Sequence, residues 1–430
     1  MKAEHEMKIL VDNSGYHLRN LGDAAMLQVG VSRLRGLWPC ARINVLTLDP
    51  QALRRLCPEA EPVSARGKML FNALGNLIPG AIRSKRSGLA ARLSGMYSEG
   101  LSVLPRGGLA LAKLRGAFKK IETGVVDEFF SAVSEADAVV CTGGGFVNDE
   151  FEGHALETLA LLRMAQRMGK PTAMFGQGLG PVTSPRLHAA ARRVLPGLSY
   201  LGLRERLGGE KLLNSVGGAP RRCLITGDDA IELALQENGK TPGSAIGLNV
   251  RVAAYSGVGH EDAVRIAGVV TRTAGGAGVG VVPFSISIHD QDSDLESLRL
   301  CGLDVESGGA SRAQSPADVI EVIGQCAVVV TGSYHGAVLA LSQGVPVVAL
   351  AKSAYYRAKF DGVADMFPGG VEVVLLESGY EDRLESALGV SLERASISRE
   401  ALLESARMQV RNGQSGYAMF KEIVDSRSWC

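Results

Sequence analysis

Short, almost wholly apolar runs recur along the chain, and each ends at glycine or polar residues. Lys8–Asp12 (KILVD), Ala138–Cys141 (AVVC) and Ala327–Val330 (AVVV) are examples, and segments with helical spacing lie between them. Strands that are apolar at nearly every position are typical of parallel sheets covered on both faces. The alternation of strand and helix therefore predicts an α/β fold built on parallel sheets.

The length of 430 residues suits two such domains. We expect a Rossmann-like N-terminal domain over residues 1–240, a Rossmann-like C-terminal domain over residues 241–398 and a helical segment over residues 399–430. The polar stretch Glu237–Ser244 (ENGKTPGS) is the expected linker. Ligands of parallel sheets bind at the carboxyl ends of the strands, and two such domains suggest a cleft between them.

Composition argues against several classes of protein. The formal net charge of +1 gives no support to nucleic-acid binding, and the seven cysteines never occur as CxxC, which argues against a zinc site or a disulfide framework. We see no signal peptide and no apolar run of membrane-spanning length, so we expect a cytoplasmic protein.

Residues 61–120 differ from the rest of the chain, because they hold eleven Lys and Arg residues and only two acidic ones. One interpretation is a solvated surface insertion. The other is a basic amphipathic segment that rests on an anionic membrane surface or lies near an anionic, lipid-linked substrate.

Two glycine-rich segments follow strands in the first half of the chain. Thr142–Asp149 (TGGGFVND) and Gly176–Pro181 (GQGLGP) allow backbone N–H groups to face an anion, and a tight structural turn is the alternative. Arg204, after a third strand, suits a carboxylate or phosphate, with an exposed salt bridge as the competing explanation. The candidate binding residues of these segments are Gly143, Gly144, Gly145, Asn148, Gln177, Gly178 and Arg204.

Asn20, Gly22 and Asp23 belong to the segment NLGD, at the start of a helix. Asp23 is either a helix cap or a carboxylate that accepts a proton or orients a sugar hydroxyl. Gly227–Asp229 is interpreted as turn and cap chemistry. Asn249 and Arg251 end the first strand of the second half, where they are candidate binding residues.

Two histidines follow strands in the second half. His289 and Asp290 lie in Pro283–Asp292 (PFSISIHDQD), whose spacing matches no standard metal pattern, so we expect either a hydroxyl-activating or orienting role or a plain loop. His335 lies at a helix start, where a neutral imidazole is favoured and can act as a general base. Its neighbours Ser333 and Tyr334 are candidate binding residues.

The ordered set of motifs resembles the polysaccharide pyruvyl transferase family. The matching pieces are NLGD, TGGGFVND, GQGLGP, GLRER, IHDQDSD, SYHGAVLALSQGVPVVAL and AKSAYYRAKFDG, between about Ile9 and Gly362. The resemblance implies a fold similar to the B-type glycosyltransferases, with two Rossmann-like domains facing across a cleft. It also implies that Arg399–Trp429 crosses back to the first domain.

The resemblance further implies that pyruvate passes from phosphoenolpyruvate to a sugar of a polysaccharide or of its lipid-linked precursor. A cyclic ketal forms and phosphate leaves, with phosphoenolpyruvate as co-substrate and no metal or other cofactor. His335 or His289 would deprotonate a hydroxyl. Many family members carry Arg where this chain has Ser333, so the donor anion would need other cations: Arg204, Arg251, Lys352, Arg357 or Lys359.

Two other functions fit the same pattern. A glycosyltransferase could hold the diphosphate of a nucleotide sugar with the same glycine loops. A non-catalytic sugar-binding protein of the same pathway would need no base, and Ser333 is compatible with it.

Overall fold

The computed structural model describes residues 6–75, 105–118, 123–236, 243–252, 256–289, 293–305 and 313–427. By packing, the chain divides into two compact units, neither of which is one continuous stretch. Unit 1 comprises Met1–Leu18, Gly30–Ile225 and Gly413–Cys430, and unit 2 comprises Arg19–Val29 and Thr226–Asn412. Most of the expected linker, residues 237–242, lies outside the described residues.

Unit 1 contains a parallel sheet with the strand order β3-β2-β1-β4-β6-β7-β8, and β5 pairs with β6. The strands are β1 (Lys8–Asp12), β2 (Arg42–Thr47), β3 (Glu61–Ser64), β4 (Ala138–Cys141), β5 (Gly144–Val147), β6 (Thr172–Leu179), β7 (Tyr200–Leu203) and β8 (Cys223–Ile225). The order reverses between β1 and β4, as in a doubly wound fold. The predicted parallel sheet is therefore confirmed here.

Helices cover both faces of this sheet. The described helices that lie wholly in unit 1 are α2 (Pro50–Leu56), α3 (Ala65–Gly75), α6 (Pro105–Phe118), α7 (Gly124–Glu135), α8 (Glu152–Arg167), α9 (Pro185–Val194) and α10 (Arg206–Ser215). Helix α1 (Leu21–Leu37) is divided, with residues 21–29 in unit 2 and residues 30–37 in unit 1. On one face Leu10 and Val139 pack in a single core with Phe129 of α7 and Leu159 of α8. On the other, Phe175 stacks on Tyr417, with ring centroids 3.7 Å apart.

Unit 2 contains a second parallel sheet, with the order β10-β9-β11-β12-β13. The strands are β9 (Ala245–Asn249), β10 (Val281–Pro283), β11 (Cys326–Thr331), β12 (Val347–Ala351) and β13 (Val371–Leu375). Its helices are α11 (Ala230–Gln236), α12 (His260–Ala277), α13 (Asp294–Leu300), α14 (Pro316–Ile323), α15 (Tyr334–Leu341) and α16 (Ala354–Met366). Here the order reverses between β9 and β11, which is where such sheets bind ligands.

Successive residues of the central strands face two different cores. Val328 and Val330 of β11 pack in the core that includes Ile266 of α12, whereas Val329 packs in the core that includes Val338 of α15. Because both faces are buried, polar side chains can reach solvent or a ligand only at the strand ends.

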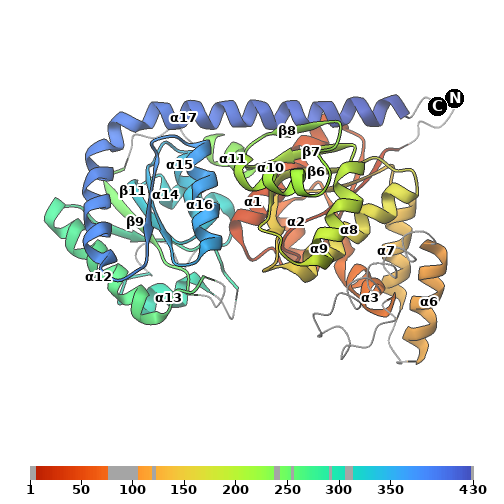
Figure 1. Ribbon diagram of the computed structural model, residues 1–430, viewed down its shortest axis with the longest axis horizontal. Coiled ribbons are helices and arrows are strands. Elements are labelled where there is room, and N and C mark those ends of the chain that lie inside the picture. The colour runs from red at the N-terminus through yellow and green to blue at the C-terminus, as the bar shows by residue number, and fades with distance from the viewer. Residues whose placement is uncertain are drawn as a thin grey trace. The chain divides into compact units, whose positions relative to one another are not determined.

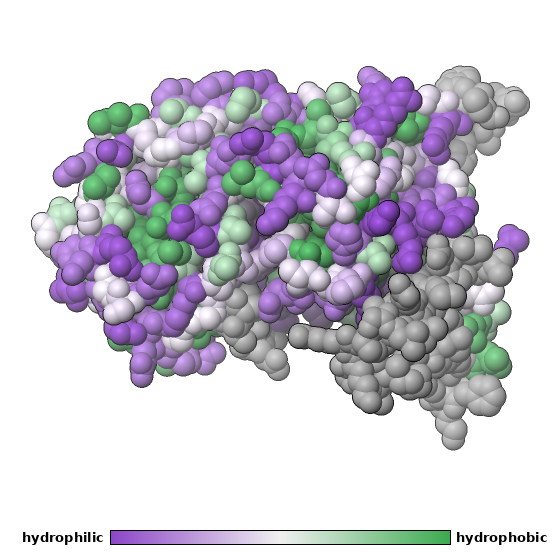
Figure 2. All heavy atoms as spheres, viewed as in Figure 1, coloured by the Kyte–Doolittle hydropathy of each residue, from purple (hydrophilic) through white to green (hydrophobic). Residues whose placement is uncertain are grey.

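The long helix α17 spans Tyr380–Arg427 (Figure 1). Its residues belong to unit 2 up to Asn412 and to unit 1 from Gly413. The helical segment expected from residue 399 is thus the second part of a longer helix. None of the described helices is both long and apolar enough to span a membrane. On the face drawn in Figure 2, hydrophilic residues predominate, with smaller groups of hydrophobic residues between them.

Candidate functional site

The sequence-predicted polar residues of unit 2 gather at the carboxyl ends of its strands. Asn249 is the last residue of β9, and its side chain is fully buried. Its Nδ2 donates to the carbonyl of Phe284 (3.1 Å) and to Oδ2 of Asp294 (2.9 Å), and its Oδ1 accepts from Oγ1 of Thr331 (2.9 Å). Asn249 therefore joins the ends of β9 and β11 to the loop after β10.

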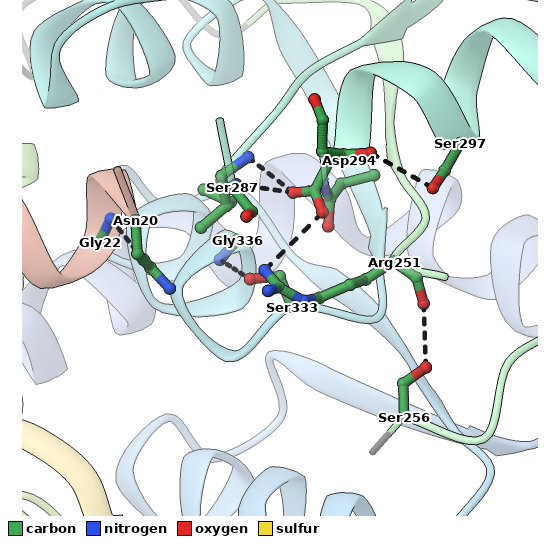
Figure 3. Close-up of polar contacts among 12 residues, drawn as sticks. Asn20, Gly22, Arg251, Ser256, Ser287, Asp294, Ser297, Ser333 and Gly336 are labelled. Atoms are coloured by element: carbon green, nitrogen blue, oxygen red, sulfur yellow. Dashed lines mark hydrogen bonds and ion pairs between the residues drawn. The ribbon is translucent and has the colours of Figure 1, made fainter. Parts of the chain in front are cut away.

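Asp294 orders that loop. Its buried Oδ2 also accepts from the backbone N–H groups of Ile286 (2.8 Å) and Ser287 (2.9 Å). Its Oδ1 lies 3.8 Å from Nη1 of Arg251, whose side chain is 10% exposed and points toward Asp294 in Figure 3. A buried carboxylate with three N–H donors and a cation beside it forms a rigid support for the residues around it.

The start of α1 lies against this loop. Asn20 pairs with Ser287 in an isolated antiparallel bridge, and the N–H of Leu21 donates to Ile286 (2.8 Å). The Oδ1 atom of Asn20 accepts from the N–H groups of Gly22 (3.1 Å) and Asp23 (3.2 Å). Asn20 therefore caps α1, so the carboxylate of Asp23, in the first turn, does not serve as the helix cap.

His335 meets this helix start. A Cβ atom added at Gly22 would lie 2.0 Å from Cγ of His335, so the imidazole occupies space that only glycine leaves open. The Nδ1 atom of His335 lies 3.9 Å from Oδ1 of Asp23, and its Nε2 lies 3.6 Å from Oδ2 of Asp228. A histidine between two carboxylates is suited to proton transfer, because an imidazole can both accept and donate a proton.

The residues around His335 are positioned by the end of β11. Ser333 is the N-cap of α15, with its Oγ accepting from the N–H of Gly336 (3.5 Å). The ring of Tyr334 lies edge-on to the imidazole of His335, with centroids 5.3 Å apart. Ser333 thus contributes a cap and no charge at this position.

The other predicted polar residues of unit 2 are held by their own neighbours. Lys352 pairs with Asp262 (2.6 Å), Lys359 lies over the ring of Tyr355 (4.3 Å) and Arg357 pairs with Asp361 (2.7 Å). His289 is half-buried, and Asp290 lies outside the described residues.

Unit 1 places Arg204 between its two glycine segments. A Cβ atom added at Gly145 would lie 2.3 Å from Nη2 of Arg204, and one added at Gly178 would lie 2.4 Å from its Nε. Arg204 as a whole is nearly buried, at 3% exposure. The glycines therefore make room for an arginine, which the sequence alone did not indicate.

The remaining polar residues of these segments bond to the protein itself. The Nδ2 atom of Asn148 donates to the carbonyl of Gly145 (2.6 Å), and Nε2 of Gln177 donates to the carbonyl of Thr142. Gly143 and Gly144 follow the end of β4, and Gly144 belongs to β5. Gly176–Leu179, expected as a loop, continues β6, with an irregularity in the pairing with β7 between Met174 and Gln177 and a positive φ of 52° at Gly176.

A second ionisable cluster lies at the end of β1 in unit 1. The fully buried Lys68 donates to Asp12, to the hydroxyl of Tyr16 (2.7 Å) and to Oγ1 of Thr158 (3.0 Å). Tyr16 and Thr158 in turn donate to Asp12, each at 2.9 Å. Lys68 therefore contributes no charge to the surface of the basic segment 61–120.

Electrostatics within this cluster favour the ion pair. Burial alone would raise the pKa of Asp12, but the charge of Lys68 and its hydrogen bonds hold that pKa below the usual range. Burial, and then the charge of Lys68, lower the pKa of the neighbouring His154 to about 4. His154 is thus neutral near pH 7.

Sequence reasoning missed two carboxylates of unit 2. The sequence favours turn chemistry for Asp228 and gives Asp294, within IHDQDSD, no role of its own. The only sequence signal was their position after strands. Among the described residues, no group of three or more His, Cys, Asp or Glu side chains is arranged to hold a metal ion.

The family model of polysaccharide pyruvyl transferases matches residues 20–353, well over half of the chain. That range includes His335, both of its carboxylate neighbours, Arg204 and Arg251. No protein of curated function matches the chain in sequence.

Solved structures share the fold at low identity. UGT2 of Phytolacca americana, complexed with UDP-2fluoro-glucose and pterostilbene, is 11% identical, with 99% of this chain and 100% of that chain covered and a TM-score of 0.53. A UDP-glucosyltransferase of Polygonum tinctorium is 13% identical (97% and 99% covered, TM-score 0.52). A UDP-GlcNAc 2-epimerase of Neisseria meningitidis is 12% identical (99% and 100% covered, TM-score 0.52). The likeness confirms the expected B-type glycosyltransferase-like fold.

Proposed function

Because the chain belongs to the polysaccharide pyruvyl transferase family, we propose that it moves a pyruvyl group from phosphoenolpyruvate to a sugar. The acceptor is a polysaccharide or its lipid-linked precursor, and the product is a ketal. The observation that carries the proposal is His335, which lies against Gly22 with a carboxylate near each ring nitrogen. Such a group can remove a proton from a sugar hydroxyl.

The chemistry balances in atoms and charge. Two acceptor hydroxyls bond to the central carbon of the donor, and the bond from that carbon to the phosphate oxygen breaks. Of the two hydroxyl protons, one ends on the former methylene carbon and the other on the phosphate. A positioned base such as His335 contributes roughly 10²–10⁴-fold to such a reaction.

The donor is an anion, and Ser333 brings it no cation. Arg251 is a cation at the carboxyl end of the unit 2 sheet, and we assign it to the donor carboxylate or phosphate. Its partner Asp294 is fully buried and already accepts three N–H groups. A guanidinium can face two anions at once, so Arg251 can bind the anion of a ligand in addition to Asp294. Arg204 is the corresponding cation of unit 1.

Thermal unfolding tests the donor. Phosphoenolpyruvate at ~100 Kd should stabilise the protein by ~2.7 kcal/mol, whereas UDP-glucose, pyruvate and inorganic phosphate at the same concentration should not. The variant Arg251→Gln should lose the shift. The matched variant Arg272→Gln changes an exposed arginine of the same unit and should keep it.

A shift with UDP-glucose and none with phosphoenolpyruvate would instead make the protein a nucleotide-sugar-dependent glycosyltransferase. Binding of saccharide without turnover of either donor would indicate a sugar-binding protein. Either result would overturn the proposal, while the family and the fold would stand.

We also propose that the protein works in the cytoplasm, with the basic segment 61–120 resting on the inner face of the membrane. Arg66, Arg106 and Lys113 are exposed residues of this segment. The protein should therefore sediment with vesicles that contain phosphatidylserine and remain in solution with neutral phosphatidylcholine vesicles. Equal behaviour with the two kinds of vesicle would refute this contact.

A further inference from the structure

The two carboxylates beside His335 differ in their access to solvent. The side chain of Asp228 is 0% exposed, whereas that of Asp23 is 19% exposed and that of His335 is 8% exposed. A substrate must approach from the open side of a group, which here is the side of Asp23. The two nitrogens of His335 are therefore not equivalent.

Asp228 is held in place by the backbone. Its Oδ1 accepts from the N–H of Ala230 at 2.9 Å, at the start of α11, which directs Oδ2 toward Nε2 of His335 at 3.6 Å. A carboxylate only accepts hydrogen bonds, so a proton on Nε2 is favoured beside it. The proton on one ring nitrogen leaves the other nitrogen with a free lone pair.

The ring cannot turn over to exchange the two nitrogens without disturbing its surroundings. The backbone of Gly22 lies so close that a Cβ there would be within 2.3 Å of both Cβ and Nδ1 of His335. Tyr334 borders the ring edge-on. The imidazole is thus fixed in one orientation before any substrate arrives.

We propose that Asp228 is a positioning residue that keeps His335 in the Nε2–H tautomer, so that Nδ1 is the nitrogen that accepts the substrate proton. In the step that closes the ketal, the O–H bond of the acceptor breaks as the N–H bond at Nδ1 forms, and the oxygen bonds to the central carbon of the donor. The bond from that carbon to the phosphate oxygen breaks, and Nδ1 passes its proton to the departing phosphate. Asp23, 3.9 Å from Nδ1, stabilises the resulting imidazolium. The catalytic part of this inference rests on the proposed function, whereas the tautomer does not.

Nitrogen NMR of protein labelled with ¹⁵N-histidine tests the tautomer directly. The His335 signals are assigned by their loss in His335→Gln. The wild-type protein should show a protonated Nε2 and an unprotonated Nδ1 in His335. A protonated Nδ1 with an unprotonated Nε2 would overturn the proposal.

The variant Asp228→Asn offers the ring an amide that can donate, so the Nδ1–H tautomer should become populated. Turnover should fall by ~10²–10⁴-fold with an unchanged KM, because a wrong tautomer removes the base without removing the binding site. The exposed Asp382 of the same unit provides the matched control, since Asp382→Asn removes the same charge and should change neither readout.

An unchanged tautomer in Asp228→Asn, or full turnover in it, would contradict the inference. If the wild-type tautomer is as expected but phosphoenolpyruvate is never consumed, the proposed function fails while the assignment of the nitrogens stands.

Discussion

The two units each carry an ionisable cluster at the carboxyl ends of their central strands, and the clusters differ in kind. In unit 1, Lys68 is buried and donates to three acceptors, two of which also bond to Asp12. In unit 2, His335 lies 3.6 and 3.9 Å from its carboxylates, beyond ideal hydrogen-bond length, and one of these carboxylates is partly exposed.

The comparison shows that position at a strand end is not enough to indicate chemistry. We call a cluster closed when each donor in it has its acceptor. Burial of such charges costs solvation free energy, which only correct pairing offsets, so a closed cluster fixes the fold. A cluster with longer contacts and a partly open side retains the capacity to exchange a proton. We therefore interpret the Lys68 cluster as structural and the His335 cluster as reactive.

Breaking the closed cluster should have the largest effect on stability. Lys68→Met leaves the carboxylate of Asp12 buried and unpaired, which should lower the free energy of unfolding by roughly 3–5 kcal/mol. Urea unfolding followed by the fluorescence of Trp38, which lies in unit 1, measures this change.

The exposed Lys113 gives the matched control, because its ion pair with Asp127 is on the surface. Lys113→Met should cost less than ~1 kcal/mol. Equal losses in the two variants would mean that the Lys68 cluster does not stabilise unit 1.

The same cluster should make the stability of unit 1 depend on pH. The pKa of His154 is lowered to about 4, below the ordinary value of 6.5, so the unfolded chain binds more protons between these values. Stability is then complete above about pH 6.5 and falls as the pH decreases toward 4, by up to about 3 kcal/mol.

In His154→Phe the urea midpoint should change less with pH across this range, because the substitution removes the titrating group. It keeps the ring contacts with Tyr16 and Phe146. His260→Gln, at an exposed histidine of unit 2, should leave the pH dependence unchanged. If the urea midpoint of His154→Phe still falls with decreasing pH, other groups cause the pH dependence of stability.

In the His335 cluster, one added methyl group should be enough to displace the imidazole of His335. Gly22→Ala places a Cβ at 2.0 Å from the ring of His335, so the ring must shift. We expect a loss of about 1–3 kcal/mol in stability and of about 10²-fold in turnover.

Gly36 lies in the same helix and has nothing within 4 Å of an added Cβ. Gly36→Ala should therefore stabilise the protein by roughly 0.5–1 kcal/mol and leave turnover unchanged. Similar turnover in the two variants would show that the position of the imidazole does not matter.

The sequence predicted the parts of the molecule that depend on local pattern. The apolar runs predicted parallel strands, and the segments NLGD and SYHG were expected to carry candidate residues. Their meeting at Gly22 and His335 could not be predicted, because it depends on how Arg19–Val29 packs in unit 2.

Two charged residues show the same limit of prediction from the sequence. Lys68 was counted with a basic surface segment, because a lysine in the sequence carries no sign of its burial. Asp228 follows a strand and precedes a short helix, a position in which most aspartates are caps, and only the structure brings its Oδ2 toward His335. Pairing across the fold, rather than residue type, distinguishes the two clusters.

The most direct test is the transfer of ¹⁴C from pyruvyl-labelled phosphoenolpyruvate into a saccharide fraction rich in polysaccharide and lipid-linked precursors. It compares wild-type protein with His335→Ala, and melting temperatures are recorded alongside. We predict transfer by the wild type, and in the variant a loss of ~10²–10⁴-fold at a nearly unchanged melting temperature. Transfer at a near-normal rate in His335→Ala, or none by the wild type into any such fraction, would contradict the account.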